Sequence, residues 1–330
     1  MPMPAISVAM SVYNGERFLA SAIKSILAQT FDDFEFLILD DGSTDASARI
    51  IGNYAAKDSR IRPIMRENRG LVASLNELLH EARAPIVARM DADDISRPER
   101  FARQTSFLAN NPDYGVVGSW TEDIDENDEP YQVTGNDHPQ DHAGFIEAIE
   151  NGWPLMCHPA AMFRRDIVLS VGGYHAAFRH CEDYDLWLRL ASVARLGSIP
   201  ERLIRYRHYE NQVSSRHATE QQIGAAVAYL AYCERAAGLR DPTADLDRLP
   251  PLNELDALFG RQGVARAIRA RVAPNLLYSR TGLRGDGFDL ICRYVREGGC
   301  RDGMWRTVAR LLRFGEPLRA ARLAATLATG

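Results

Sequence analysis

Three aspartates directly after an apolar run are the residues of this chain best suited to chemistry. Asp91, Asp93 and Asp94 lie within four positions, immediately after the β-branched run 86–90. A helix is expected to start just beyond them at Pro98. Carboxylates at the carboxyl end of a buried strand lie where open α/β sheets bind ligands, and their oxygens suit Mg²⁺ or Mn²⁺. The pattern indicates a site for a divalent metal and a diphosphate.

A capped loop ahead of the Pro98 helix is the alternative interpretation of this cluster, and Asp94 fits that role best. Three like charges at this spacing repel one another, however, unless a cation or hydrogen-bond donors offset them. The cation site therefore remains the favoured prediction.

Short β-rich runs and amphipathic stretches alternate along the first 120 residues, which predicts a mostly parallel sheet with helical crossovers. The expected strands are 6–10, 34–39, 61–65, 86–90 and 115–119, and the expected helices are 16–28, 45–56, 71–82 and 98–110. The acidic stretch 121–130 suggests a hairpin or surface loop. Further along, 182–194 is predicted to be a helix and 203–207 a strand, and from about residue 218 every segment with a clear period is helical.

Composition places the chain among soluble globular proteins. Its 330 residues are enough for one large α/β domain and a smaller appendage, and no apolar run approaches the roughly 18 residues of a membrane span. The first residues, Met-Pro-Met-Pro-Ala, lack the regions of a secretory signal. Five widely spaced cysteines without a C-x-x-C pair are typical of a reducing compartment. We therefore expect a cytoplasmic protein.

Positive charge is concentrated in the last 70 residues, which hold fourteen arginines against five acids although the whole chain carries −5. The favoured interpretation is a helical cap with solvated arginines or a homodimer surface. The alternative is a basic helical face that rests on anionic lipid at the inner membrane surface. Nucleic acid is not expected as a partner, because aromatic residues do not interleave with the arginines as a stacking platform.

Several motifs in a fixed order resemble family 2 glycosyltransferases of the GT-A fold, over about residues 4–216. They are ISVAMSVYNG at 6–15, AQTF at 28–31, LDDGSTD at 39–45, DADD at 91–94 followed by Pro98, GGY at 172–174, and ED at 182–183. The resemblance implies an α/β GT-A (nucleotide-diphospho-sugar transferase) fold with a mostly parallel central sheet, followed by a helical carboxyl-terminal domain. We expect a catalytic domain at 1–217, with its nucleotide-sugar half at about 1–120 and its acceptor half at about 121–217. The helical domain is expected at 218–330.

The resemblance also implies an activity. Such enzymes transfer a sugar, with inversion, from a nucleotide diphosphate donor to an acceptor hydroxyl. A UDP-sugar is the donor most typical of the family, and a saccharide or lipid-linked molecule of bacterial surface polysaccharide or glycolipid synthesis is the expected acceptor. The rivals are a sugar nucleotidyltransferase, whose glycine-rich phosphate loop is missing here, and a catalytically silent nucleotide-sugar-binding subunit. A glycoside hydrolase would use paired carboxylates but needs no cation site.

Roles in donor binding follow by similarity. Ser11, Tyr13 and Glu16 map to the loop that holds the base, and Asp41 maps to the acid that contacts the pyrimidine edge. The chemistry agrees, since a carboxylate can accept the imide N–H and a phenol can pack on the base. A turn with a helix cap is the alternative for 40–45. Asp93 maps to the ligand of Mn²⁺ or Mg²⁺, and Asp91 lies near the ribose or behind the metal ligands.

The acceptor side is assigned in the same way. Asp183 maps to the base that deprotonates the acceptor, and Glu182 is expected to contact acceptor or donor sugar. Acids that complement a helix dipole are the alternative for both. Trp187 stacks on a sugar or, in the favoured interpretation, packs the core. His158 lies under the acceptor or is a structural histidine.

One segment departs from the family pattern. Many relatives carry Tyr-Arg-x-His at the position of 206–209, with the histidine near the metal or diphosphate, but this chain has Tyr209 in that place and His208 one residue early. Alternation along a strand sends the two side chains to opposite faces. Either a bulge turns His208 inward or Tyr209 substitutes as a neutral oxygen donor, so the sequence leaves the metal requirement open.

Overall fold

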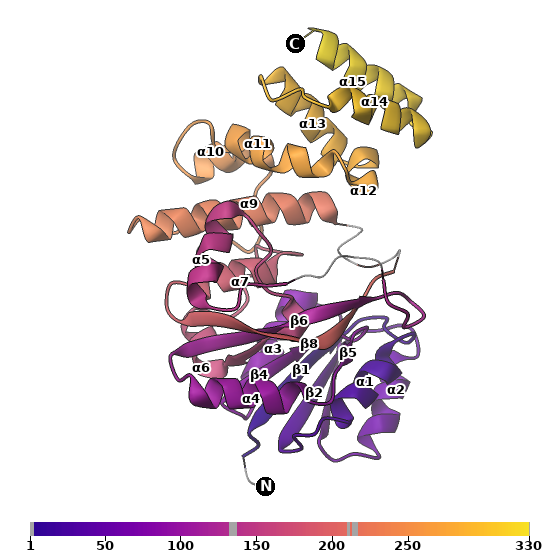
Figure 1. The fold of residues 1–330 in the computed structure, drawn as a ribbon, viewed down its shortest axis with the longest axis vertical. Coiled ribbons are helices and arrows are strands. Elements are labelled where there is room, and N and C mark those ends of the chain that lie inside the picture. Colours follow the sequence, from indigo (N-terminus) through magenta and orange to yellow (C-terminus); the bar gives the residue numbers. More distant parts are fainter. Residues whose placement is uncertain (1–2, 132–136, 210–211, 213–216, 330) are drawn as a thin grey trace. The chain divides into compact units, whose positions relative to one another are not determined.

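The computed structural model describes residues 3–131, 137–209, 212 and 217–329. The chain forms two compact units, residues 1–176 with 182–209 and residues 177–181 with 210–330 (Figure 1). We call them unit 1 and unit 2. The expected division at residue 217 differs from this boundary, and the assignment of catalysis to 1–217 stays a prediction.

Unit 1 is built on a sheet of eight strands within the described residues, in the order β3-β2-β1-β4-β7-β6-β8-β5. The strands are β1 (Ile6–Val12), β2 (Phe34–Asp41), β3 (Ile61–Arg66), β4 (Ile86–Met90), β5 (Ile95–Ser96), β6 (Tyr114–Ile124), β7 (Met162–Arg164) and β8 (Arg195–Arg207). β1 to β4 pair in parallel, as do β6 and β8, whereas β7 and β5 run antiparallel to their neighbours. The prediction of a mostly parallel sheet is confirmed.

Helices cover this sheet because their apolar residues recur on one side. In α1, for example, Leu19, Ala22, Ile23 and Ile26 are all buried, at the spacing of one helical face. α3 packs on β1 and β2, α2 packs along β3, and α4 packs along β6. The helices of unit 1 are α1 (Leu19–Leu27), α2 (Ser47–Ala55), α3 (Leu71–Glu81), α4 (Arg100–Asn110), α5 (His142–Asn151), α6 (Arg165–Ser170) and α7 (Glu182–Leu190), with a 3₁₀ turn at His158–Ala160.

The described part of unit 2 is helical, as its sequence predicts. α11 contacts both α9 and α13, and α15 contacts both α13 and α14. Its elements are α9 (Ala218–Ala236), a 3₁₀ turn (Leu252–Glu254), α10 (Leu255–Leu258), α11 (Val264–Leu276), α12 (Arg280–Arg284), α13 (Gly287–Arg296), α14 (Met304–Arg313) and α15 (Pro317–Thr329). No helix in the described ranges has the length and apolar character to cross a membrane.

Candidate functional site

The ends of three parallel strands bring the predicted site residues to one edge of the sheet. Met10 of β1 lies beside Met90 of β4, and Val12 lies beside Asp40 of β2. A Cβ atom placed on Gly15 would lie 3.7 Å from the Cβ of Ala92, so the loop after β1 also reaches the loop after β4. The turns that follow β1, β2 and β4 therefore meet at the carboxyl edge, as open α/β sheets require for ligand binding.

The three aspartates after β4 form a compact acidic cluster. One carboxylate oxygen from each of Asp91, Asp93 and Asp94 lies within 4.8 Å of the others. Asp94 is fully buried; its Oδ1 accepts from the amide of Arg207 at 2.8 Å, and its Oδ2 has no hydrogen-bond partner among the described residues. Burial, followed by repulsion from Asp91, raises the pKa of Asp93 to about 6, and burial with both neighbours raises the pKa of Asp94 well above its usual range. Negative charge on the two buried carboxylates is therefore costly.

Tyr209, and not His208, contacts this cluster. The phenol of Tyr209 donates to Oδ2 of Asp93 at 3.0 Å. The ring of His208 is turned away, with Nε2 2.9 Å from Oδ1 of Asp123, and it stacks on Tyr131. Of the two arrangements open at the sequence level, the structure has the one in which Tyr209 takes the place of the histidine.

Two buried arginines hold the acidic loop, and sequence reasoning missed both. Arg207 is 1% exposed; besides its amide bond to Asp94, its Nε donates to the carbonyl of Asp93 at 2.7 Å, and its Nη1 donates to the carbonyl of Asp125 at 3.0 Å. Arg89, inside β4, forms an ion pair with Asp91. Burial lowers the pKa of Arg89, but the Asp91 carboxylate outweighs it and the pKa is raised, so the guanidinium stays charged.

Gln29, which belongs to the AQTF motif, holds the far end of the same loop. Its Oε1 accepts from the amide of Phe101 at 3.0 Å, and its Nε2 donates to the carbonyl of Arg97 at 2.7 Å and to the hydroxyl of Ser96 at 3.1 Å. A single buried amide thereby connects the end of α1 to the start of α4. This contact explains why the motif carries an amide.

The loops after β1 and β2 are joined by hydrogen bonds. Asn14, at φ +51°, donates its amide to the hydroxyl of Ser43 at 2.9 Å and accepts from the amide of Thr44 at 2.8 Å. Glu16 is engaged too, because its carboxylate accepts from the amide of Ala46 at 2.8 Å. Two of the predicted base-contacting residues lie next to these bonds. Ser11, near the end of β1, is partly buried, and Tyr13 is 57% exposed.

Asp41 is buried, and its carboxylate already interacts with three donor groups. It accepts from the amides of Arg69 at 2.9 Å and Gly70 at 2.8 Å, and it pairs with Arg66 at 2.8 Å. The carboxylate therefore organises residues 66–70 at the edge where a base would lie. A base contact by Asp41 stays a prediction.

The first turn of α7 supplies a second pair of acids. Glu182 is buried, and its Oε2 has no hydrogen-bond partner in the described part of the chain; Oδ1 of Asp183 accepts from the amide of Tyr184 at 2.7 Å. Burial, followed by repulsion from Asp183, raises the pKa of Glu182 to about 8, and burial also raises the pKa of Asp183. The charges of Arg89 and Asp91 also act on both acids, so the pair lies near the acidic loop.

Three aromatic side chains, those of His158, Tyr174 and Trp187, pack together beside these acids. Nε2 of His158 is 2.8 Å from the hydroxyl of Tyr174, and Trp187 packs edge-on to the His158 ring at 6.0 Å between centroids. Burial, followed by the charge of Arg89, lowers the pKa of His158 well below its usual range, so this histidine is neutral. Trp187 is 1% exposed, which favours its packing role over stacking on a sugar.

The GGY motif positions Tyr174. A Cβ on Gly173, whose φ is +69°, would lie 2.6 Å from Oδ1 of Asn76, which accepts from the amide of Tyr174 at 2.8 Å. Arg189, paired with the buried Asp185, donates to the carbonyl of Gly173 at 2.8 Å. Glycine is required here because a side chain would displace the asparagine that holds the turn.

Asp91 is thus ion-paired with the buried Arg89, and Glu182 and Asp183 lie close enough to both for their charges to interact. Asp41 lies at the same edge with its carboxylate directed to residues 66–70.

The chain belongs to glycosyl transferase family 2, whose family model matches residues 7–172. The EpsE protein of Bacillus subtilis is 35% identical over 73% of this chain and 85% of its own length. The O-antigen biosynthesis glycosyltransferase WbnJ of Escherichia coli is 33% identical over 61% of this chain and 79% of its own. An E. coli UDP-Gal:alpha-D-GlcNAc-diphosphoundecaprenol beta-1,3-galactosyltransferase is 29% identical over 56% of this chain and 67% of its own.

Solved structures share the fold. TarS of S. aureus, residues 1–349 with UDP-GlcNAc, has a TM-score of 0.55 at 16% identity and covers 98% of this chain and 88% of its own. The mannosyltransferase PcManGT of Pyrobaculum calidifontis, with GDP-Man and Mn²⁺, has a TM-score of 0.51 at 17% identity, covering 98% and 86%. The protein is therefore a glycosyltransferase with a GT-A fold, as its sequence motifs imply.

Proposed function

We propose that this glycosyltransferase inverts the anomeric centre while it moves a sugar from a UDP-sugar to a hydroxyl of a saccharide or lipid-linked acceptor. The observation that carries the proposal is that the Glu182–Asp183 pair lies close enough to Arg89 and Asp91 for their charges to act on it, with Trp187 of the same helix packed on His158. One set of acids can serve the acceptor while the other serves the donor diphosphate. A silent binding subunit would have no use for the α7 pair.

Asp183 is the proposed base. Its carboxylate takes the proton of the acceptor hydroxyl as that oxygen bonds to the anomeric carbon, and the bond from this carbon to the diphosphate breaks with its electron pair leaving on the diphosphate oxygen. Attack from the face opposite the leaving group inverts the centre. The pKa of Glu182, raised to about 8, keeps Glu182 protonated near neutral pH, which leaves Asp183 as the member of the pair proposed to accept the proton.

The acidic loop fits Mn²⁺ or Mg²⁺. Its three carboxylates are hard oxygen donors, and Oδ2 of Asp94 has no hydrogen-bond partner among the described residues. Burial, followed by repulsion from Asp91, raises the pKa of Asp93, and a cation would offset both effects. Asp93 would hold the ion, with Asp91 adjacent. When bound, the ion supplies positive charge to the departing diphosphate. Arg207 fixes the backbone of this loop whether or not the ion is present.

The donor nucleotide is assigned to the two hydrogen-bonded loops after β1 and β2. Tyr13 exposes a ring for base packing, and Ser11 and Glu16 flank it. Asp41 is assigned to the pyrimidine edge and Asp91 to the ribose side. His158 and Glu182 are assigned to the acceptor side, next to Asp183.

The acceptor class and location are inferred from the relatives and from unit 2. One relative's name specifies a diphosphoundecaprenol-linked sugar, and another's specifies O-antigen biosynthesis, so we infer a lipid-linked saccharide acceptor in surface polysaccharide or glycolipid synthesis. We place the enzyme in the cytoplasm. Many arginines of unit 2 have internal partners, such as Arg269 with Glu297 and Arg322 with Asp289, which supports the helical-cap interpretation over lipid contact.

The test is a screen of nucleotide sugars for transfer and for slow hydrolysis, with Mn²⁺, with Mg²⁺ and with a chelator. We expect turnover of a UDP-sugar, dependence on the ion and a product of inverted anomeric configuration by NMR. Asp183→Asn should lose about 100-fold or more in transfer while it keeps the affinity for UDP. A product of retained configuration, or full activity in Asp183→Asn, would refute the mechanism.

A further inference from the structure

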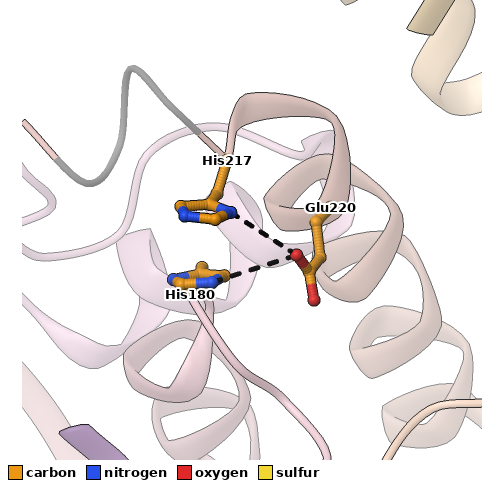
Figure 2. A group of neighbouring side chains, drawn as sticks. All are labelled: His180, His217 and Glu220. Atoms are coloured by element: carbon orange, nitrogen blue, oxygen red, sulfur yellow. Dashed lines mark ion pairs between the residues drawn. The ribbon is translucent and has the colours of Figure 1, made fainter. Parts of the chain in front are cut away.

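Unit 2 holds a second group of metal-type donors, formed by two histidines and a glutamate. Figure 2 shows the rings of His180 and His217 stacked, with both directing a nitrogen at the Glu220 carboxylate. Nε2 of His180 lies 3.9 Å and Nδ1 of His217 lies 3.6 Å from the same Oε2 of Glu220. One ligand atom of each residue lies within 4.8 Å of the other two.

The local backbone explains how the three side chains meet. His217 is the residue just before α9, and Glu220 lies three positions later in its first turn, the i, i+3 spacing at which a histidine and a glutamate can bind one ion. His180 comes from the separate segment 177–181 and has a φ of +66°, a left-handed conformation that is uncommon outside glycine. This backbone turns its imidazole over the start of α9.

The contacts within the group are too long to be hydrogen bonds. At 3.6 Å and 3.9 Å the nitrogens are beyond hydrogen-bond reach of Glu220, and neither imidazole has any other hydrogen bond among the described residues. The side chains are 25%, 43% and 53% exposed for His180, His217 and Glu220. Solvent and ions can therefore reach the nitrogens and the carboxylate of this group.

We propose that His180, His217 and Glu220 bind a transition-metal ion of the class that prefers imidazole, with Zn²⁺ as the reference ion and solvent in the remaining positions. Two imidazole nitrogens and one carboxylate oxygen are a zinc donor set. The set differs from the all-oxygen cluster of Asp91, Asp93 and Asp94, which suits Mg²⁺ or Mn²⁺. Binding requires the stacked rings to open by small side-chain rotations, because bonds to zinc are about 2.1 Å long and lie in the ring plane.

The charges around the group are mixed, and Arg179 is close enough to His180 to lower its pKa. His217 and Glu220 line a pocket of about 710 Å³ that also includes Arg280, Arg284 and Asp286. The two arginines are engaged elsewhere: Arg280 lies over the Phe314 ring, and Arg284 donates to the carbonyl of Phe314. The ion would join the segment 177–181, which precedes Glu182 in the chain, to the first turn of α9.

The test measures Zn²⁺ binding by calorimetry on the full chain with excess Mg²⁺, which occupies the aspartate cluster. Cys300→Ser serves as the parent, because Cys300 is exposed and thiolates bind zinc. We expect His217→Ala and Glu220→Gln each to weaken Zn²⁺ binding by about 10-fold or more. His80→Ala, which removes an exposed histidine of α3, should bind as the parent does.

Two further measurements make the outcome decisive. Zn²⁺ should raise the Tm of the parent but not of His217→Ala, and the two proteins should melt alike without metal. Asp93→Asn should keep the Zn²⁺ site, so failure here is distinct from failure of the proposed transferase mechanism. Equal Zn²⁺ affinity in parent, His217→Ala and Glu220→Gln would overturn the proposal and leave the group as a stacked ion-pair cap of α9.

Discussion

The Tyr209 hydroxyl donates to Oδ2 of Asp93 at 3.0 Å, in the position that the family resemblance gives to a histidine. A phenol brings a proton to the carboxylate but no positive charge. Burial, followed by Asp93, raises the pKa of Tyr209 above its ordinary value, so Tyr209 stays a neutral donor at neutral pH. The acidic loop of this enzyme is therefore more negative than one with a protonated histidine in that place.

Removing this hydroxyl should weaken the metal site. In Tyr209→Phe the ring can still pack on Phe18, 5.3 Å away between centroids, but Asp93 loses a hydrogen bond worth about 1 kcal/mol. We expect the Mn²⁺ concentration for half-maximal transfer to rise about 5-fold. His208→Ala is the matched control, because its ring faces Asp123, and it should leave that concentration unchanged. Identical Mn²⁺ dependence in Tyr209→Phe and wild type would contradict the prediction.

Asp41→Asn should lower stability and nucleotide affinity together. The carboxylate is buried and accepts from two amides and from Arg66, and an asparagine would turn an N–H₂ toward one of these donors. We expect a loss of about 2 kcal/mol in the free energy of unfolding, from urea denaturation, and weaker UDP binding by calorimetry. Loss of stability with unchanged UDP affinity would restrict Asp41 to organising residues 66–70.

Glu182→Gln should change the pH dependence of stability. The pKa of Glu182 is raised to about 8 by burial and by Asp183, so its neutral form favours the folded state. That contribution is complete below the ordinary pKa of 4.5, is lost progressively as the pH rises toward about 8, and is gone above it. The free energy of unfolding of the wild type should therefore fall more steeply than that of Glu182→Gln between about pH 5 and pH 8, and the two curves should run parallel above about pH 9. Parallel curves between about pH 5 and pH 8 would show that folding does not raise the pKa of Glu182.

In unit 2, Arg269 should matter for stability more than its exposed counterparts. Arg269 is buried in α11 and donates to both oxygens of Glu297, at 2.7 Å and 2.6 Å. Arg269→Ala should lower the free energy of unfolding by about 2 kcal/mol, because it removes two charge-assisted bonds. Arg306→Ala, at an exposed position of α14, should stay within about 0.5 kcal/mol of wild type. Similar effects of the two changes would contradict an internal role for Arg269.

The fold was predictable where periodicity is strong. Strand β4 spans Ile86–Met90, the bounds expected from its β-branched sequence. The predicted 203–207 strand is the end of a longer one, β8, which starts at Arg195. Its first half contains glycine and proline and pairs with β6 through register shifts, so alternation is lost there. The three-residue β7 is too short to give a period.

The site was predictable where short motifs carry it and not where the partners are distant. Asp93 and Asp183 belong to short sequence motifs. Arg207, in contrast, contacts Asp94 across 113 positions, and no feature of the sequence around Arg207 indicates this contact. Arg89 interrupts an apolar strand, which could have signalled a buried counter-charge for the acids that follow. The turn of His208 toward Asp123 likewise depends on a neighbouring strand.

Asn14 and Glu16 are hydrogen-bonded to residues 43–46 at the edge where a donor nucleotide would bind. Two connecting segments that are already immobilised by each other have little conformational entropy left to lose when a ligand arrives. Association at this edge should resemble docking onto a rigid surface, fast and with small structural adjustment.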